Sequence, residues 1–389
     1  MKNYTRALTA FVILVLGLGN WVNTGDFWIN LFVFVYCAAV VLVPQKFATH
    51  FKKNWIIVLP LLIAFVISAF VNSTSLRNYL SREPVDETYR TDMDDFLKTY
   101  YLMKKGNSYY LSFKQAVEAN AFKSTVSANA WSWRTPTIFY IWKIIPGTNG
   151  VYIYYFFLGF VCITLLCAYK LIHSLLPQNR GHYAILAPYL LYPYFHFATR
   201  DNTFLQTEWW GIQIAVWALY FLIKDRMGWA ALLWTLTLTI RELFIIPFLL
   251  QITVLFIKRQ PHRRILLIPL IIFGIFLLWH FQMVIQIVSA TSGFFTPRLH
   301  TLGKMIILPT LAFGSWEYLF SQWRVFIIFY IISAVGLFQV RSYSSWLIGC
   351  FLLFPVSFLF IGSSVYNDYW GIFYIPVVLI SVPLVLHHL

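Results

Sequence analysis

Long apolar blocks alternate with short polar segments along the whole chain. The blocks Ile56–Val71, Val151–Tyr169 and Ile265–Leu278 contain no charged residue. A helix needs about 20 apolar residues to cross a bilayer, and several blocks approach that length. The pattern predicts an all-α polytopic membrane bundle of about ten to twelve transmembrane helices, which forms a single integral membrane domain over residues 1–389.

Composition points to the same class of protein. The chain is 60% hydrophobic and 11% charged, whereas a soluble domain carries about 25% charged residues. Its net charge of +15 does not indicate nucleic-acid binding, because the basic residues gather in short loops such as Gln45–Asn54 and Lys258–Arg264. That distribution is typical of cytoplasmic loops. The four cysteines all fall inside apolar blocks, without metal-ligand spacing, and are predicted to be free thiols.

Basic residues also orient the predicted helices. Lys2 and Arg6 place the amino terminus on the cytoplasmic side. Residues 72–134 then form an external loop with juxtamembrane helices, and residues 289–322 form a second external segment. The predicted full spans are Ala7–Trp21, Phe27–Val43, Trp55–Val71, Gly150–Ile172, Tyr183–Thr199, Phe204–Ile223, Ile265–Val288, Val325–Val340, Trp346–Gly362 and Gly371–Leu386.

One apolar segment does not fit a single crossing. Trp229–Ile257 has basic loops at both ends, Lys224–Arg226 and Lys258–Arg264, so one crossing would place one of them on the wrong side. Arg241 and Glu242 stand at its middle. We therefore predict two short helices that meet at this pair, as interrupted helices do where they line a site.

Acidic residues are few, 14 in all, and their densest run opens a helical pattern in the first external loop. In that run Asp92 is predicted to cap the helix, with Asp95 at the capping-box position. A solvated helix start is one interpretation. The other is a general base held at the membrane surface, with Asp92, Asp94 and Asp95 as candidates. Because Asp92-Met93-Asp94 spells D-x-D, a divalent metal remains an option; no other cofactor is predicted.

Several cations are predicted at or near the external face, where they would hold a lipid phosphate. Arg241 and Glu242 could instead form a structural ion pair. The basic residues of the second external segment could instead belong to a loop that contacts water or lipid headgroups. The phosphate-binding candidates are Arg134, Arg241, Arg298, His300 and Lys304. Further acidic candidates are Glu208, Glu242 and Asp368.

The first external loop resembles that of GT-C fold glycosyltransferases. Asp92, Phe96, Gly106 and Tyr110 match D-x3-aromatic-x9-G-x3-Y, and Arg134–Tyr140 resembles the (Y/R)-x-P-x-x-(Y/F) segment of that family. Glu208 and the Arg241-Glu242 interruption are also similarly placed, so the resemblance covers about residues 72–250.

This resemblance implies an inverting transfer of sugar from a polyprenyl-phosphate-linked donor to a lipid-linked or glycan acceptor, at the external face of a plasma or inner membrane. It implies that Asp92 is the base, while spacing leaves Asp94 and Asp95 as alternatives. Membrane lipids are expected partners. A transporter or flippase is an alternative, but it would have a matched pair of broken helices, and the sequence shows one broken segment. A polysaccharide ligase or polymerase is another, but its large external loop would lie late in the chain, whereas here it lies early.

Overall fold

The computed structural model describes residues 2–18, 26–42, 55–84, 91–120, 129–200, 202–288, 323–357 and 370–388. These residues form helices joined by short turns and contain no β-strand, which confirms the predicted all-α class. The helices are α1 (Lys2–Leu18), α2 (Phe27–Leu42), η2 (Trp55–Val58), α4 (Leu59–Asn72), α5 (Thr74–Leu80), α6 (Asp92–Lys104), α7 (Tyr109–Glu118), η4 (Ala130–Ser132), α8 (Thr137–Ile144), α9 (Val151–Leu175), η5 (Gln178–Ile185), α10 (Leu186–Arg200), η6 (Asn202–Leu205), α11 (Thr207–Ile223), α12 (Met227–Ile240), η7 (Glu242–Phe244), α13 (Ile245–Ile257), η8 (Arg263–Leu266), α14 (Leu267–Val288), α16 (Trp323–Val340), α17 (Tyr343–Leu352), η9 (Phe354–Ser357), α19 (Ile375–Ser381) and η11 (Val382–His387).

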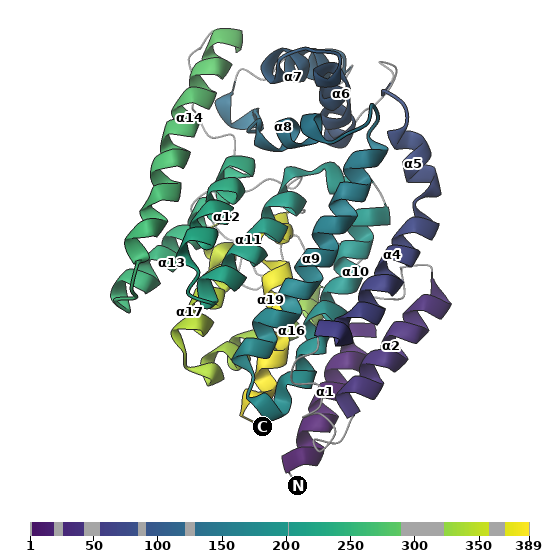
Figure 1. The fold of residues 1–389 in the computed structure, drawn as a ribbon, viewed down its shortest axis with the longest axis vertical. Helices are drawn as coiled ribbons and strands as arrows, with labels where there is room; N and C mark the ends of the chain where they lie inside the picture. Colours follow the sequence, from purple (N-terminus) through teal and green to yellow (C-terminus); the bar gives the residue numbers. More distant parts are fainter. Residues whose placement is uncertain are drawn as a thin grey trace.

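Two layers are visible in Figure 1. Most helices run along the long axis and form a bundle, and both chain termini lie at its lower end. Helices α6, α7 and α8 lie across the opposite end, and we call these three helices the cap. An aromatic core holds the cap together: the Phe96 ring on α6 lies 6.5 Å from Phe113 of α7 and 5.6 Å from Phe139 of α8, measured between centroids. The cap is thus a packed layer over one end of the bundle.

Helix length and composition test the predicted membrane spans. Val151–Leu175 and Arg263–Val288 are each long and apolar enough to cross a bilayer. A third span would arise if Ile56–Asn72 and Thr74–Leu80, which are bent by 65° at their junction, counted as one. The number of ten to twelve crossings stays a prediction.

The outer surface of the bundle is apolar. On α14 the residues Ile268, Ile271, Ile275 and Leu278 are exposed, and their spacing of three or four places them on one helix face. The equivalent stripe on α4 includes Ile63 and other large side chains. Continuous apolar stripes of this kind are rare on surfaces that meet water.

The predicted interruption at Arg241 and Glu242 is confirmed. Helix α12 ends at Ile240, Arg241 adopts an extended conformation (φ −150°, ψ 109°), and α13 starts at Ile245 after a single 3-10 turn. The rings of Trp234 and Phe248, at equal distances along the chain from Arg241, pack with centroids 4.7 Å apart. The two short helices therefore fold back on each other with Arg241 near their apex.

Other predicted boundaries change where proline interrupts the backbone ladder. The predicted span Gly371–Leu386 becomes α19 followed by the 3-10 helix η11, with Pro376 and Pro383 at the starts of the two elements. The predicted span Trp346–Gly362 begins earlier, at Tyr343, and α17 ends at Leu352. The segment predicted as the first external loop contains α5, α6, α7 and η4.

Candidate functional site

The three clustered aspartates have three different environments. Asp92 is the first residue of α6, and its side chain is exposed. Asp94 belongs to a capping box in which its carboxylate accepts from the backbone N–H of Thr91 at 2.7 Å and the Thr91 hydroxyl accepts from the Asp94 N–H. Its other oxygen accepts a hydrogen bond from the Tyr79 hydroxyl. Asp94 is therefore tied to the start of α6 and to α5.

The predicted capping arrangement is wrong by one residue. Asp92 and Asp95 were expected as cap and box partner, but Thr91 and Asp94 have these positions. The cap residue must have an extended backbone, and Thr91 does, with φ −81° and ψ 171°. Asp92 is already inside the helix, so its carboxylate is not engaged as a cap.

Asp95 is the buried member of the run, with 1% of its surface exposed. The side-chain amide of Asn120, just after α7, donates to its two carboxylate oxygens at 3.2 and 3.3 Å. This contact joins α6 to the end of α7. It also fixes the direction of the Asp95 carboxylate, which the sequence pattern did not indicate.

A buried ionic cluster lies where the bundle meets the cap. The Arg241 Nε donates to Glu208 Oε1 at 2.7 Å, and its Nη1 donates to Glu242. Glu208 is 1% exposed, whereas the Glu242 side chain is 21% exposed. We call Glu208, Arg241 and Glu242 the junction cluster. The structure brings together three of the residues predicted from sequence, two carboxylates on one guanidinium.

Arg134 connects the junction cluster to the cap. Its positive charge acts on the carboxylate of Glu242 and on Tyr109 of α7. The Tyr109 hydroxyl donates to the Arg134 carbonyl at 2.5 Å, and the neighbouring Thr135 hydroxyl donates to the carbonyl of Ile240 at 2.8 Å. Cap, Arg134 and the end of α12 are thereby held in register.

His280 is a site residue that sequence reasoning missed. It stands alone in the apolar stretch of α14, where a single histidine is more often a satisfied polar residue than a ligand. In the structure it is 1% exposed, and its Nδ1 lies 2.9 Å from the Tyr110 hydroxyl. Among the described residues its Nε2 has no hydrogen-bond partner of standard geometry, although the backbone of Trp133 and the charge of Glu242 lie near the ring. The lone histidine was the available signal.

The remaining candidates lie outside the described residues. Arg298, His300 and Lys304 belong to residues 289–322, and Asp368 belongs to residues 358–369. Within the described part of the chain, no group of three or more His, Cys, Asp or Glu side chains is arranged to hold a metal ion.

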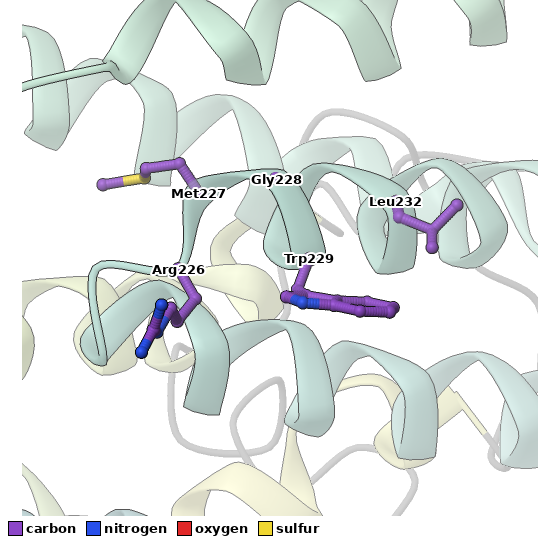
Figure 2. Close-up of a pocket in the computed structure, with 5 residues that line it drawn as sticks. All are labelled: Arg226, Met227, Gly228, Trp229 and Leu232. Carbon is purple, nitrogen blue, oxygen red and sulfur yellow. The ribbon is translucent and has the colours of Figure 1, made fainter.

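A surface hollow of about 420 Å³ lies at the start of α12, lined by Arg226, Met227, Gly228, Trp229 and Leu232 (Figure 2). A helix of this length rises roughly 20 Å, so the hollow is remote from Arg241 at the other end of α12. It contains none of the predicted site residues.

No family model, no curated protein and no solved structure matches this chain.

Proposed function

We propose that the chain is a polytopic membrane glycosyltransferase that takes sugar from a polyprenyl-phosphate donor at the cap end of its bundle. The observation that carries the proposal is the junction cluster, a set of buried charges at the end of α12 that Thr135, next to the cap helix α8, contacts through the Ile240 carbonyl. Charged groups inside an apolar bundle are costly and are functional candidates for that reason. The apolar outer stripes and the two long apolar helices support the membrane setting.

The junction cluster offers chemistry for a phosphate. Glu208, buried on α11, holds Arg241 through Nε and so orients the guanidinium. Glu242 is the more exposed of the two carboxylates, so an incoming phosphate would compete with it for the Nη atoms. A guanidinium keeps its proton and matches two phosphate oxygens.

Arg134 and His280 extend the same site. Arg134 is partly exposed on the cap side, and the charge of Glu242 acts on the buried imidazole of His280. Arg298, His300 and Lys304 stay in the proposal as predicted phosphate ligands, and Asp368 as an acidic candidate. A phosphate held by these groups would be stabilised as it leaves the sugar.

A carboxylate of α6 would act as the base. In a single displacement the acceptor oxygen bonds to the anomeric carbon, the bond from that carbon to the phosphate oxygen breaks, and the electron pair leaves with the phosphate. The acceptor proton passes to the carboxylate. Asp94 is engaged by Thr91 and Tyr79. We assign the base to Asp92 because its side chain is exposed, where an acceptor can reach it, with Asp95, which Asn120 orients, as the alternative.

The resemblance of Asp92–Tyr110 and Arg134–Tyr140 to GT-C enzymes supports the same reaction. The alternatives of a lipid transporter or a polysaccharide ligase use no aspartate of α6 as a base for sugar transfer, so the base is where the proposal is tested.

The test is turnover of the purified full chain in lipid nanodiscs with a panel of polyprenyl-phosphate sugars. Removal of a general base costs roughly 100- to 10,000-fold in rate, and Asp92→Asn should show this loss. Asp94→Asn should be milder, and Arg134→Gln should weaken donor use. Arg226→Gln, in the remote hollow of Figure 2, is the matched control and should behave as wild type.

The variants also distinguish the two assignments. If Asp92→Asn is active and Asp95→Asn is inactive, the base is Asp95 and the reaction stands. If all three aspartate variants turn over normally, or no donor of the panel is used, the glycosyltransferase proposal fails.

A further inference from the structure

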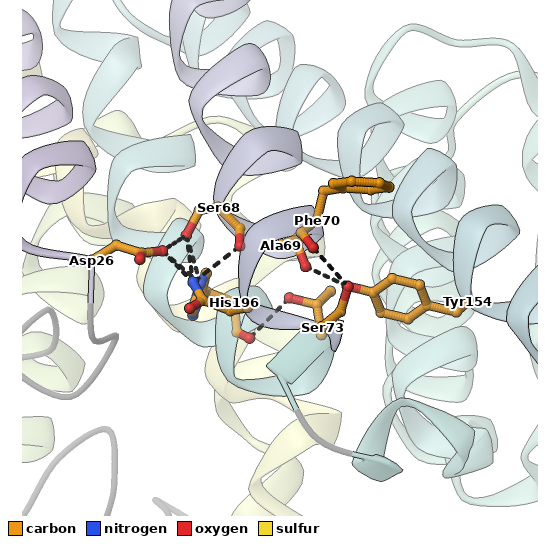
Figure 3. Close-up of polar contacts among 9 residues, drawn as sticks. Asp26, Ser68, Ala69, Phe70, Ser73, Tyr154 and His196 are labelled. Carbon is orange, nitrogen blue, oxygen red and sulfur yellow. Dashed lines mark hydrogen bonds and ion pairs between the residues drawn. The ribbon is translucent and has the colours of Figure 1, made fainter. Parts of the chain in front are cut away.

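A second polar cluster lies inside the bundle, apart from the junction cluster. Figure 3 shows Asp26 at the start of α2, Ser68 on α4 and His196 on α10 pointing toward one another. The Ser68 hydroxyl donates to Asp26 Oδ2, and the Ser68 oxygen lies 2.8 Å from the His196 Nε2. The Asn72 amide also donates to Asp26 Oδ2. We call Asp26, Ser68, Asn72 and His196 the hinge cluster.

The hinge cluster is sealed on one side and open on the other. Ser68 and His196 are buried, with 0% and 1% of their surface exposed, whereas 14% of the Asp26 side chain is exposed. The carboxylate therefore reaches the edge of the bundle and the imidazole does not. Ionisable groups in such an apolar interior are functional candidates by default.

Hydrogen-bond chemistry fixes where the protons are. Ser68 has one hydroxyl proton and gives it to Asp26. The contact between Ser68 and the His196 Nε2 must then use a proton on the imidazole. A directed chain of donors runs from His196 through Ser68 to Asp26, with a titratable group at each end.

Adding a proton to Asp26 changes this chain. A protonated Asp26 uses one of its oxygens as a donor and accepts less from Ser68 and Asn72. A proton on His196 would instead place a positive charge 3.9 Å from the carboxylate and strengthen the cluster. Protonation of Asp26 therefore weakens its hold on the last turn of α4.

The other charged and titratable groups around the cluster are cations and phenols. The charge of Arg200 acts on His196. Tyr192 stacks parallel to the imidazole at 6.2 Å between centroids. Arg77 of α5 lies 4.1 Å from the centroid of the Phe70 ring. From α9, Tyr154 donates to the Ala69 carbonyl at 2.9 Å, as Figure 3 also shows. Asp26 is the carboxylate of the cluster, and its charge acts on His196 and Tyr192.

The hinge cluster lies at the bend that carries the cap. Helices α4 and α5 meet at Ser73 with an angle of 65°, directly after Asn72. At the other end of α5, the Leu80 carbonyl accepts from the Tyr101 hydroxyl of α6 at 2.7 Å. The Tyr79 hydroxyl bonds Asp94. A change in the last turn of α4 is therefore transmitted through α5 to α6.

We propose that the hinge cluster is a proton-binding site, and that taking up one proton on Asp26 in acid loosens the bend between α4 and α5, the helix that contacts α6 of the cap. The inference concerns the stability of this bend, and it holds whatever reaction the cap serves.

Amide hydrogen exchange of the full chain in nanodiscs, without donor or acceptor, tests the proposal. Peptides covering residues 69–80 are followed at about pH 7 and about pH 3.5, on either side of the range in which carboxyl groups ordinarily titrate, with each rate divided by its intrinsic rate at that pH. Protection of this segment in the wild type should fall about tenfold or more in acid, the factor expected for loss of a hydrogen bond to a charged group. Protection of α9 should stay constant.

Variants assign the effect. Asp26→Asn imitates the protonated carboxyl, so its segment 69–80 should be weakly protected at both pH values. His196→Gln, which keeps a donor toward Ser68, should retain the response to pH because Asp26 still takes up the proton. His173→Gln, on the far end of α9, is the matched control and should respond as wild type. A wild-type segment whose corrected protection does not change with pH overturns the proposal, as does an Asp26→Asn variant that still titrates fully.

Discussion

The junction cluster and the hinge cluster both hold charged groups inside the bundle, but they surround those charges with different partners. Both join different helices of the bundle, and both lie at an interruption of an apolar helix. In the junction cluster, the guanidinium of Arg241 has a permanent charge and faces two carboxylates. In the hinge cluster, Asp26 faces the neutral donors Ser68 and Asn72 and an imidazole. One set of charges is fixed and suits the binding of an anion, while the other can change with one proton.

The difference also concerns what each break does to the backbone. At Arg241 the chain becomes extended, and the guanidinium is held between α11 and η7. At Ser73 the chain continues as a second helix at an angle, and α5 connects it to the cap. The break at Arg241 positions a guanidinium, and the bend at Ser73 connects α4 through α5 to the cap.

The largest expected effect is a difference between the two clusters in how much each contributes to the free energy of unfolding. Arg241→Gln leaves Glu208 buried without its cation and should cost about 3–5 kcal/mol of unfolding free energy. Asp26→Asn loses hydrogen bonds to a charge and should cost about 1.5–3 kcal/mol. Unfolding in detergent, followed by tryptophan fluorescence, measures both. The double variant Glu208→Gln with Arg241→Gln should recover part of the loss. Equal losses in the two single variants would show that the two clusters do not differ as described.

A smaller effect is expected from packing behind the junction cluster. A Cβ on Gly211 would lie 2.4 Å from the Phe244 ring, so Gly211→Ala must displace η7. Overpacking of this kind costs about 1–3 kcal/mol. Gly274→Ala is the matched control, because no atom lies within 4 Å of its Cβ. Thermal unfolding compares the two, and hydrogen exchange at residues 69–80 should keep its response to pH in both. Unfolding of Gly211→Ala at the wild-type temperature would contradict the close approach.

The smallest expected effect concerns the cap, where the phenol of Tyr100 titrates only in alkaline solution. Burial, and then the neighbouring Tyr101, raises the pKa of Tyr100 to about 12. Since this folded pKa is above the unfolded value of about 10, its stabilisation is complete below pH 10 and is lost as the pH rises toward 12. At pH 10.5 the loss is about 0.8 kcal/mol. Tyr100→Phe should remove this part of the alkaline slope in unfolding measurements, and an unchanged slope would contradict it.

Parts of the site could be predicted because their signals are local or statistical. The break at Arg241 was predicted because basic loops flank Trp229–Ile257 on both sides. A helix that starts at the aspartate run was predicted from periodicity, and α6 spans Asp92–Lys104. Its cap was misplaced by one residue, because Thr91 and Asp92 are both good caps and only the backbone angles distinguish them.

The long-range contacts of His280 and of the hinge cluster could not be predicted in the same way. Tyr110 and His280 are 170 positions apart, and Ser68 and His196 are 128 positions apart. Each histidine appears in the sequence as a single polar residue in an apolar block. Nothing in such a block indicates which distant helix will pack against it.

The sequence by itself determined the helical class, the apolar surface, the interruption at Arg241 and the concentration of carboxylates at the start of the cap. These features depend on composition and on periodicity within a few turns, which local hydrogen bonding and burial dictate. The tertiary structure alone decided that Asp94 caps while Asp95 is buried, that Arg241 binds Glu208, and that Asp26 meets His196. Such pairings depend on how whole helices pack, and packing joins residues whose separation along the chain carries no signal of their contact.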